Sequence, residues 1–348
     1  MAKFPKNHWY VAAWSSELGE RPLGRRLLGE PVVLFRQSEN SVAALIDRCP
    51  HRLVPLSLGT CVNGHIRCTY HGLEFDGTGR CVHIPAQNLI PPNAQTRSFP
   101  VIERYGLIWV WMGDPALADP GSLPKITKHG EPGWDVLEGG YQYHPSNYRN
   151  IIENLMDPAH TTFVHSNTIG NPLAGDEPVT TEKTDQYIVA YRWIEKTQPT
   201  PYDRKRLNVG DIEVDRGQFF YFHLPCMSRV ETIVVPAGTE RVEEKGGKGL
   251  RTFSYKFLTP ESDSATHFFW LHIRNYMLGD PEAAAKLRSA LEQTFAEDLA
   301  IEAAMQRSQE ETGIRQLMAL EIDRAPMLAL RMLDRMIDAE AARGAPAR

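Results

Sequence analysis

The chain has 348 residues, a length that suggests two or three domains, and its 42% hydrophobic and 23% charged residues are an ordinary globular mixture with enough apolar material for a large core. It carries 38 Lys and Arg against 43 Asp and Glu, a formal net charge of −5, and this balance argues against a nucleic-acid partner, because phosphate binding needs a surplus of cations. No apolar run approaches the ~20 residues of a membrane helix and no signal-peptide core opens the chain, so we expect a cytoplasmic protein without a membrane partner.

Short runs of β-branched and aromatic residues, separated by turn formers, predict strands throughout the first third of the chain. These runs are 9–14, 31–36, 41–47 and 107–113. Residues 71–83 predict a hairpin that turns at Asp76-Gly77 or Thr78-Gly79. Three prolines between 114 and 124 indicate a boundary, so we expect one domain over 1–115 and a second over 116–348.

The second part of the chain mixes helices and strands, which predicts an α+β fold class. Helical apolar spacing covers 146–165, although Pro158 must end or bend that helix. Strand-like runs return at 219–224, 231–236 and 266–273, and 243–249 is expected to be an exposed hairpin tip. Asp280 and Pro281 predict the start of a long helix, and a last helix is expected over roughly 314–341.

Two short segments in the first part each offer one thiol and one imidazole, namely Cys49 with His51 and Cys68 with His71. Four such groups can hold a single tetrahedral zinc, or a Rieske [2Fe–2S] cluster in which two thiolates bind one iron and two imidazoles the other. Zinc fingers usually place Cys pairs and His pairs in separate loops, so the mixed loops favour the cluster. Cys61 and Cys81 lie outside this pattern and are expected to be buried apolar residues.

A second group of polar residues lies at Asn154, Asp157 and His160, which are three residues apart and therefore share one face of a helix. His165 is roughly 140° around an ideal helix from His160, so the two histidines converge only if the helix is distorted. Pro158 makes that distortion plausible. Two histidines converging on one metal would leave space for a carboxylate.

The carboxylate is expected from the helix that begins at Asp280, whose apolar stripe runs through Leu287, Leu291, Phe295, Ile301 and Met305. Asp298 lies inside this stripe, at roughly +20° from Leu287, and Glu302 is a weaker rival at roughly +60°. A buried carboxylate needs a cation or strong hydrogen-bond donors as its partner. A metal ion would serve, but so would an arginine or a helix end. Two histidines and one carboxylate form the facial triad of non-haem Fe(II) oxygenases.

Both sites together resemble those of the Rieske non-haem iron oxygenases, specifically the oxygenase component of vanillate and dicamba O-demethylases. The likeness includes CPHRLVPLSLG, YHGLEFDGTGRCVHIP, ERYGLIWVWMGDPALADPG, NLMDPAHTTFVH and LTPESDSATHFFW. The resemblance implies an all-β Rieske domain followed by a helix-grip-like catalytic domain, an antiparallel sheet with helices. It implies cluster ligands at Cys49, His51, Cys68 and His71, and iron ligands at His160, His165 and Asp298.

The resemblance also implies a ring-shaped homotrimer, in which Asp157 bridges a cluster-ligating histidine of a neighbouring subunit to His160. Asn154 is expected to support the iron site. No G-x-G-x-x-G fingerprint follows a strand, so electrons must come from NAD(P)H through a separate reductase or ferredoxin. Residues 166–178 are rich in turn formers, as a mobile lid over the substrate pocket would be.

The implied activity is an O2-dependent monooxygenation of an aromatic acid, in which hydroxylation of an aryl methyl ether gives an unstable hemiacetal that releases formaldehyde. Candidate partners for the substrate anion are Lys256, Arg274, His223 and His272. A ring-hydroxylating dioxygenase or an alkyl-group hydroxylase would use the same metal centres. A Rieske electron carrier is a third possibility, and it would hold two irons per chain where the oxygenase holds three.

Overall fold

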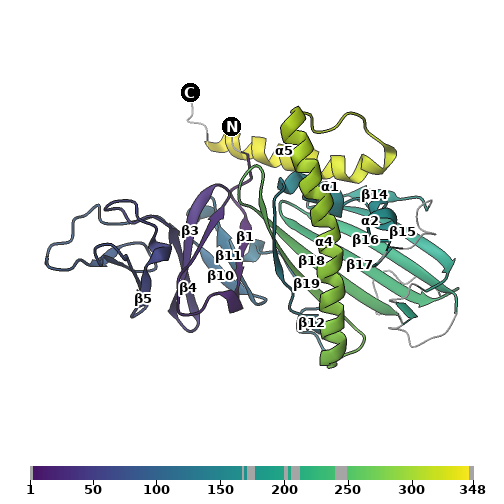
Figure 1. The fold of residues 1–348 in the computed structure, drawn as a ribbon, viewed down its shortest axis with the longest axis horizontal. Helices are drawn as coiled ribbons and strands as arrows, with labels where there is room; N and C mark the ends of the chain where they lie inside the picture. Colours follow the sequence, from purple (N-terminus) through teal and green to yellow (C-terminus); the bar gives the residue numbers. More distant parts are fainter. Residues whose placement is uncertain are drawn as a thin grey trace. The chain divides into compact units, whose positions relative to one another are not determined.

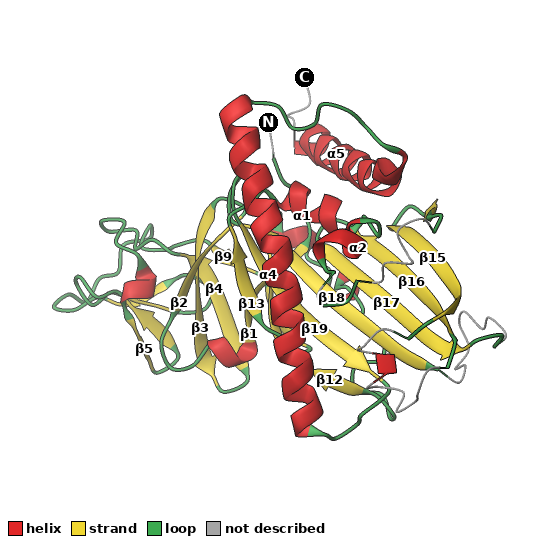
Figure 2. Cartoon of the chain, turned by 45° about the vertical axis from the view of Figure 1, so that its right-hand side comes forward, coloured by secondary structure: helices red, strands yellow, loops and turns green. Residues whose placement is uncertain are grey.

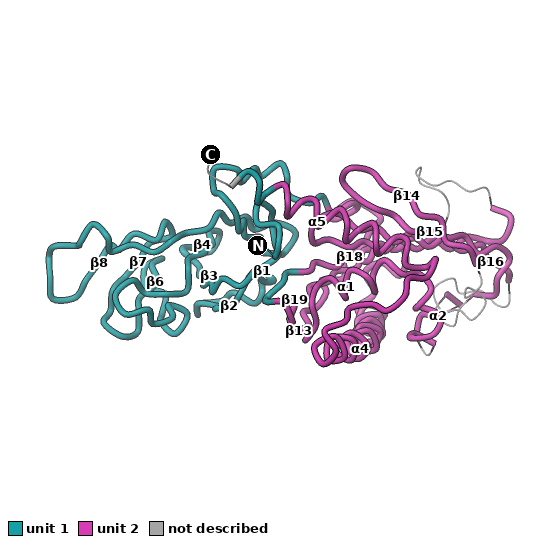
Figure 3. The backbone as a smooth tube through the Cα atoms, turned by 90° about the horizontal axis from the view of Figure 1, so that it is seen from above, with its two compact units in different colours: residues 1–125, 259–262, 340–348 teal, residues 126–258, 263–339 magenta. Residues whose placement is uncertain are grey.

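The computed structural model describes residues 3–166, 168–170, 177–199, 203–204, 212–239 and 249–344. The chain forms two compact units, coloured separately in Figure 3: residues 1–125, 259–262 and 340–348 make the first, and residues 126–258 and 263–339 the second. The sequence does not predict the two late returns to the first unit. They are held there by backbone groups, since Leu28 N donates to Pro260 O and the Glu340 carboxylate accepts from Lys6 N and Asn7 N.

The first unit is built from three small antiparallel sheets (Figure 1). The first sheet is β1 (Trp9–Trp14), β11 (Leu107–Trp111) and β10 (Val101–Arg104). The second is β2 (Leu23–Leu27), β3 (Glu30–Ser38), β4 (Ser41–Ile46) and β9 (Ser98–Phe99). The third is β5 (Thr60–Val62), β6 (His65–Arg67), β7 (Glu74–Phe75) and β8 (Cys81–His83). All four strands predicted in this region are therefore confirmed.

The predicted hairpin is also confirmed, because β7 and β8 pair as antiparallel neighbours. Its turn is stabilised by Asp76 Oδ1, which accepts from the backbone amides of Thr78 and Arg80. Gly79 adopts φ +85°, and a Cβ there would come within 2.0 Å of the Thr96 carbonyl oxygen. The turn therefore needs a glycine at that position. Cys81 is buried in the apolar core of this unit, as expected, whereas Cys61 is only partly buried and packs against that core.

The second unit is an eight-stranded sheet with helices on it, which confirms the α+β class. Its strand order is β12 (Asp135–Leu137), β19 (Thr266–Arg274), β18 (Leu250–Pro260), β17 (Met227–Pro236), β16 (Val214–His223), β15 (Tyr187–Thr197) and β14 (Thr180–Lys183), and β13 (Tyr141–His144) also pairs with β19. The predicted strands at 219–224, 231–236 and 266–273 all fall within this sheet. The predicted hairpin tip at 243–249 lies almost wholly outside the described residues.

The helices are α1 (Tyr148–Leu155), α2 (His160–Val164), α4 (Pro281–Thr312) and α5 (Arg324–Gly344). The predicted helix at 146–165 is divided into α1 and α2 around Pro158, because proline cannot donate to the helical hydrogen-bond pattern. α4 begins as predicted, with Asp280 accepting from the amides of Glu282 and Ala283, and it lies across one face of the sheet (Figure 2). Phe295 of α4 packs against Phe268 and Trp270 of β19.

Two helical predictions are wrong. The last helix begins at Arg324 and not near 314, since Leu317 and Met318 have exposed side chains and give that segment no apolar face to bury. On α4, Ile301 is 45% exposed, so the buried stripe does not continue through it. The buried face continues instead through Asp298 and Glu302, which are polar. None of the described helices is long and apolar enough to span a membrane.

Candidate metal centres and substrate cavity

The two Cys–His loops of the first unit have matching backbone geometry. The amide of Cys49 donates to Val54 O and that of Cys68 to Leu73 O, so each cysteine bonds the residue five positions later. The carbonyl of each cysteine accepts from the residue four positions later, Leu53 in one loop and Gly72 in the other. Both of these residues have positive φ, +59° and +75°. Each cysteine is thus fixed at the start of a tight loop.

The four side chains of these loops converge in pairs of like kind. His51 Nδ1 lies 3.1 Å from His71 Nδ1, and both cysteines are buried. Burial raises the pKa of Cys49 to about 11; the backbone amide of His51 opposes this effect, and the neighbouring Cys68 thiol adds to it. A cation that holds both sulfurs as thiolates removes this penalty. Two facing imidazoles and two facing thiols suit a cluster that binds sulfur on one iron and nitrogen on the other.

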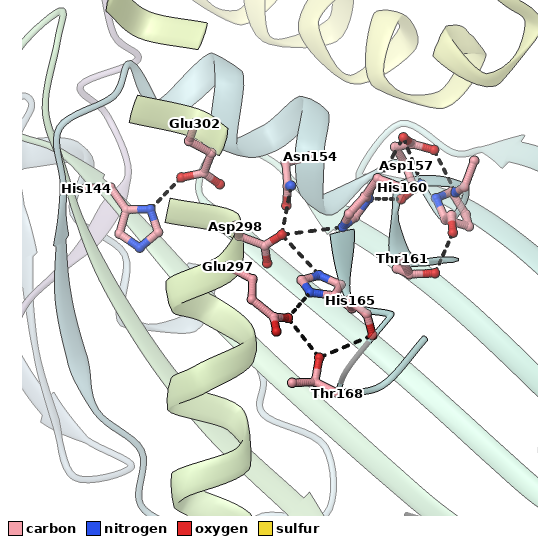
Figure 4. A network of polar contacts seen from close by, with 12 residues as sticks. His144, Asn154, Asp157, His160, Thr161, His165, Thr168, Glu297, Asp298 and Glu302 are labelled. Atoms are coloured by element: carbon pink, nitrogen blue, oxygen red, sulfur yellow. Dashed lines mark hydrogen bonds and ion pairs between the residues drawn. The ribbon is translucent and has the colours of Figure 1, made fainter. Parts of the chain in front are cut away.

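The second unit brings together three of the residues that the sequence predicts as metal ligands. One ligand atom each of His160, His165 and Asp298 lies within 4.8 Å of the others. Asp298 Oδ1 is 3.1 Å from His165 Nε2 and 3.6 Å from His160 Nε2 (Figure 4). His160 opens α2 and His165 directly follows it, so this short helix turns both rings towards α4. The donor set, two imidazoles and one carboxylate, fits a divalent transition metal such as iron.

Further hydrogen bonds hold these three side chains. Asn154 Nδ2 donates to Asp298 Oδ1 at 3.1 Å, which places Asn154 beside the triad as expected. Burial by itself raises the pKa of Asp298, but the bond and charge of His165, with His160 and Asn154, bring the pKa below its usual value. Glu297 Oε2 accepts from His165 Nδ1 at 2.8 Å. Sequence reasoning missed Glu297.

Asp157 organises the turn that carries His160. Its Oδ1 accepts from Ala159 N and its Oδ2 from His160 N, while His160 Nδ1 bonds the backbone carbonyl of Asp157. The carboxylate itself lies 3.9 Å from His160 Nδ1. Burial raises the pKa of Asp157, and the charge of His160 partly offsets that effect. Asp157 therefore orients His160 through its backbone, with its carboxylate next to the ring.

A buried arginine that the sequence does not single out supports the same turn. Arg192 of β15 is 3% exposed, and its Nη2 donates to Pro158 O at 3.0 Å and to Thr161 Oγ1 at 3.3 Å. Its Nε donates to Gln218 Oε1 at 2.8 Å, which ties the turn to the next strand of the sheet. Burial lowers the pKa of Arg192 to about 10, so the guanidinium keeps its charge at neutral pH.

Glu302, the rival to Asp298, points elsewhere. Its Oε2 lies 2.5 Å from Nδ1 of His144, and both side chains are 1% exposed. The His144 ring stacks on Phe268 with centroids 4.6 Å apart. Because Glu302 is one helical turn beyond Asp298 and already has a partner, Asp298 is the residue of α4 that completes the triad (Figure 4).

A cavity of about 310 Å³ opens beside the triad, a size within the usual range for small-molecule sites. The sheet contributes even-numbered positions only, because alternate residues of a strand face the same side. They are 216, 218 and 220 on β16, 230 and 232 on β17, 252, 254 and 256 on β18, and 272 on β19. α4 contributes Leu287, Leu291 and Phe295, which give the cavity an apolar surface alongside its polar side chains.

Of the four predicted substrate residues, Lys256 and His272 line this cavity, and the other two do not. His223 occupies an odd position on β16, and its ring contacts Tyr187 and Tyr221 instead. Arg274 lies at the end of β19, where its Nη2 is 3.5 Å from Asp135 Oδ2. Much of the predicted lid at 166–178 falls outside the described residues, although Thr168 and Ile169 line the cavity.

Lys256 is the cavity residue with the most unusual surroundings. It is 4% exposed, and its ammonium has a single long hydrogen bond in the described part of the chain, 3.4 Å to Ser254 O. It also lies 5.8 Å from the centroid of the Phe295 ring. Burial lowers the pKa of Lys256 to about 7, against a smaller opposing effect of the Asp298 charge. The cavity therefore contains a cationic group without a carboxylate partner of its own.

Residues 8–100 match the Rieske [2Fe-2S] domain, and residues 145–339 match the vanillate O-demethylase oxygenase C-terminal domain. The chain belongs to the Rieske oxygenases of the vanillate O-demethylase family. As a Rieske oxygenase it uses a [2Fe–2S] cluster, a mononuclear non-haem iron and O2. It is the oxygenase component of a multicomponent monooxygenase system, in which a separate component typically supplies the electrons.

Relatives of this Rieske oxygenase match along nearly the whole chain. It is 38% identical to the oxygenase component of dicamba O-demethylase from Stenotrophomonas maltophilia, over 97% of this chain and 99% of that protein. It is 36% identical to a vanillate O-demethylase oxygenase subunit from Pseudomonas sp., over 97% of this chain and 96% of that protein. The crystal structure of dicamba monooxygenase bound to 3,6-dichlorosalicylic acid matches with a TM-score of 0.90 and 38% identity, covering 98% of this chain and 99% of that one.

Proposed function

We propose that this oxygenase demethylates a methoxylated aromatic acid. The observation that carries the proposal is the buried Lys256 in the wall of the cavity onto which His160, His165 and Asp298 open. A cation with no carboxylate partner favours an anionic ligand, and the apolar side chains of Phe220, Leu291 and Phe295 in the same wall suit an aromatic ring. Relatives named for dicamba and vanillate O-demethylation support the same substrate class and reaction.

We infer that His160, His165 and Asp298 hold the mononuclear iron, and that Cys49, His51, Cys68 and His71 hold the cluster. When bound, the iron supplies open coordination positions at which O2 is activated. The reaction is ArOCH3 + O2 + 2 e⁻ + 2 H⁺ → ArOH + HCHO + H2O. One oxygen atom enters the methyl C–H bond, the resulting hemiacetal loses formaldehyde to leave the phenol, and the other oxygen atom becomes water. Both electrons come from the separate reductase or ferredoxin.

The residues of the chain then have distinct roles. Lys256 binds the substrate anion and so fixes which end of the ring faces the triad, with His272 beside it on β19. Asn154 keeps the Asp298 carboxylate oriented through its hydrogen bond. The apolar side chains of α4, Leu291 and Phe295 among them, keep bulk water away from the reacting methyl group.

We further propose a ring-shaped homotrimer in which Asp157 faces the cluster of a neighbouring copy. Large apolar side chains are exposed on both of the surfaces that would meet: Leu53 (67%) and Tyr70 (56%) beside the cluster loops, and Phe163 (75%) on α2. Tyr70 also stacks on His71 with centroids 3.9 Å apart. Such exposure is typical of protein interfaces. Light scattering should give the mass of three chains, and Phe163→Glu should reduce it to that of one.

All five cysteines are free of disulfides, as suits a reducing compartment, and we propose the cytoplasm as the site of action.

The decisive experiment for the reaction is a single turnover of chemically reduced protein with O2. It uses matched pairs of aromatic acids with and without a methoxy group, followed by mass spectrometry and a formaldehyde assay. Formaldehyde and the phenol in equal amounts support demethylation. A cis-diol or a benzylic alcohol without formaldehyde would make the protein a dioxygenase or an alkyl hydroxylase instead.

A further inference from the structure

Glu297 precedes Asp298 on α4, and both carboxylates reach the same imidazole. Glu297 Oε2 is 2.8 Å from His165 Nδ1, and Asp298 Oδ1 is 3.1 Å from His165 Nε2 (Figure 4). Consecutive helical residues point roughly 100° apart, and the two carboxylates accordingly meet the ring at different nitrogens. The ring of His165 is 2% exposed and is therefore held at both nitrogens. With Nδ1–H donated to Glu297, the Nε2 lone pair is directed at the metal site.

The second histidine of the triad has a different partner. His160 Nδ1 bonds the backbone carbonyl of Asp157, which is a neutral acceptor. An imidazole that donates to a carboxylate gains negative character and becomes a stronger metal ligand than one that donates to a carbonyl. The two histidines are therefore not equivalent ligands.

The Glu297 carboxylate has a second donor, Thr168. The Thr168 hydroxyl donates to the same Oε2 at 2.8 Å, and the Thr168 amide bonds His165 O at 3.0 Å. Thr168 also lines the substrate cavity. The turn is tightly packed, because a Cβ on Gly170 would come within 2.7 Å of the His165 carbonyl oxygen. One short turn thus joins the cavity wall, the Glu297 carboxylate and the His165 ring.

We propose that Glu297 is a positioning residue that makes His165 the stronger imidazole ligand of the iron, and that the Thr168 hydroxyl orients Glu297 for this task. The proposal rests on the iron site proposed above and adds a residue to it. Its consequences concern the metal itself. Loss of the Glu297 charge weakens iron binding and, because negative charge near the metal favours the ferric state, makes the reduction potential of the iron more positive.

The first test uses Glu297→Gln, which keeps the size of the side chain and removes its charge. Fe(II) affinity is measured by chelator competition on protein that retains its [2Fe–2S] cluster but lacks mononuclear iron. We expect affinity to fall by about 10-fold or more, the usual cost of losing an outer-shell carboxylate. Glu292→Gln on the exposed side of α4 is the matched control and should bind Fe(II) like the wild type. Equal affinity in all three proteins would overturn the proposal.

Two further variants separate a ligand effect from loss of structure. Thr168→Val should lose part of the affinity, and Thr168→Ser, which keeps the hydroxyl, should retain it. A redox titration followed by the high-spin ferric EPR signal should show a more positive potential for Glu297→Gln, which a merely loosened fold would not produce. If Thr168→Ser behaved like Thr168→Val, or if the potential were unchanged, the proposal would be wrong.

His165→Ala identifies which assignment has failed. If that variant still binds mononuclear iron with wild-type affinity, the iron site itself is misplaced. If it loses the iron while Glu297→Gln keeps wild-type affinity and potential, the iron site stands and the role of Glu297 does not.

Discussion

Replacing Lys256 by methionine tests both the substrate class and the physical reading of the cavity. The change keeps an unbranched, flexible side chain that is one atom shorter, and it removes the charge. A hydrogen bond between charged groups contributes roughly 1.5–3 kcal/mol, which is about a 10- to 100-fold rise in KM for a carboxylated substrate. For a neutral analogue of the same ring, KM should change little. Lys286→Met is the control, since Lys286 is exposed and pairs with Glu282 on α4.

The same substitution has an expected effect on stability. Burial lowers the pKa of Lys256 from 10.5 to about 7, and each pKa unit corresponds to about 1.4 kcal/mol, so keeping this amine buried costs the folded state on the order of 4 kcal/mol at pH 7. Since the folded pKa lies below the unfolded one, the unfolded chain binds more protons between pH 7 and 10.5, and stability rises with pH across that window. Lys256→Met should stabilise the protein at pH 7 and flatten that rise.

The assays are steady-state turnover with paired carboxylated and neutral substrates, and denaturant unfolding from pH 6 to pH 10. The pKa also predicts that kcat/KM for the anionic substrate falls as pH rises through about 7, because the free enzyme then loses the charge that attracts the anion. A variant that is less stable than the wild type, with KM unchanged for both substrates, would refute this reasoning. It would mean that the Lys256 ammonium has a strong partner and is not available to substrate.

Three further predictions concern the metal centres. Asp157→Asn should retain the cluster and the iron while kcat falls by about 100-fold, and full activity with both metals present would rule out the bridging role. His165→Ala should lower iron content from three to two per chain while the visible spectrum of the cluster persists, so three irons in the variant would argue against this ligand. Glu302→Gln should retain all three irons but cost about 3–5 kcal/mol in unfolding free energy, because it breaks a buried pair with His144, and loss of iron would instead make Glu302 a ligand.

The residues that the sequence predicts best are those whose geometry is local. The matched loops around Cys49 and Cys68 follow from short spacings, and a break near Pro158 follows from the chemistry of proline. Predicting that His160, His165 and Asp298 converge required only two assumptions. The first helix had to be distorted, and Asp298 had to lie on the buried face of its own helix, as its angular position indicates. Each of these needs little knowledge of how distant segments pair.

The cavity could not be predicted in the same way, because it depends on strand register across four strands. A shift of one residue moves a side chain to the opposite face of a sheet. Lys256 and His272 fall on the cavity face, whereas His223 falls on the other. Composition does not separate these three residues. Glu297 was missed for a related reason, since its direction on the helix does not by itself indicate that its long side chain reaches His165.

The wrong prediction for the stripe of α4 has a physical cause that bears on the site. Periodicity predicts an apolar face, but in its second half the buried face carries Asp298, Glu302 and Gln306, each one turn from the next. Every one of them has a partner outside α4: Asp298 with His165 after α2, Glu302 with His144 of β13, and Gln306 Oε1 with the amide of Asn147 before α1.

An apolar face would allow α4 to rotate by a few degrees about its axis at little cost, because dispersion contacts have no strong direction. Three buried hydrogen-bonded groups in a row do not allow such a rotation, since it would leave charged or polar atoms unpaired in a medium of low dielectric constant. The polar face therefore fixes the rotation of α4 about its axis, and with it the direction in which the Asp298 carboxylate points. We expect the catalytic geometry to depend on Glu302 and Gln306 for this reason, although neither is within the triad.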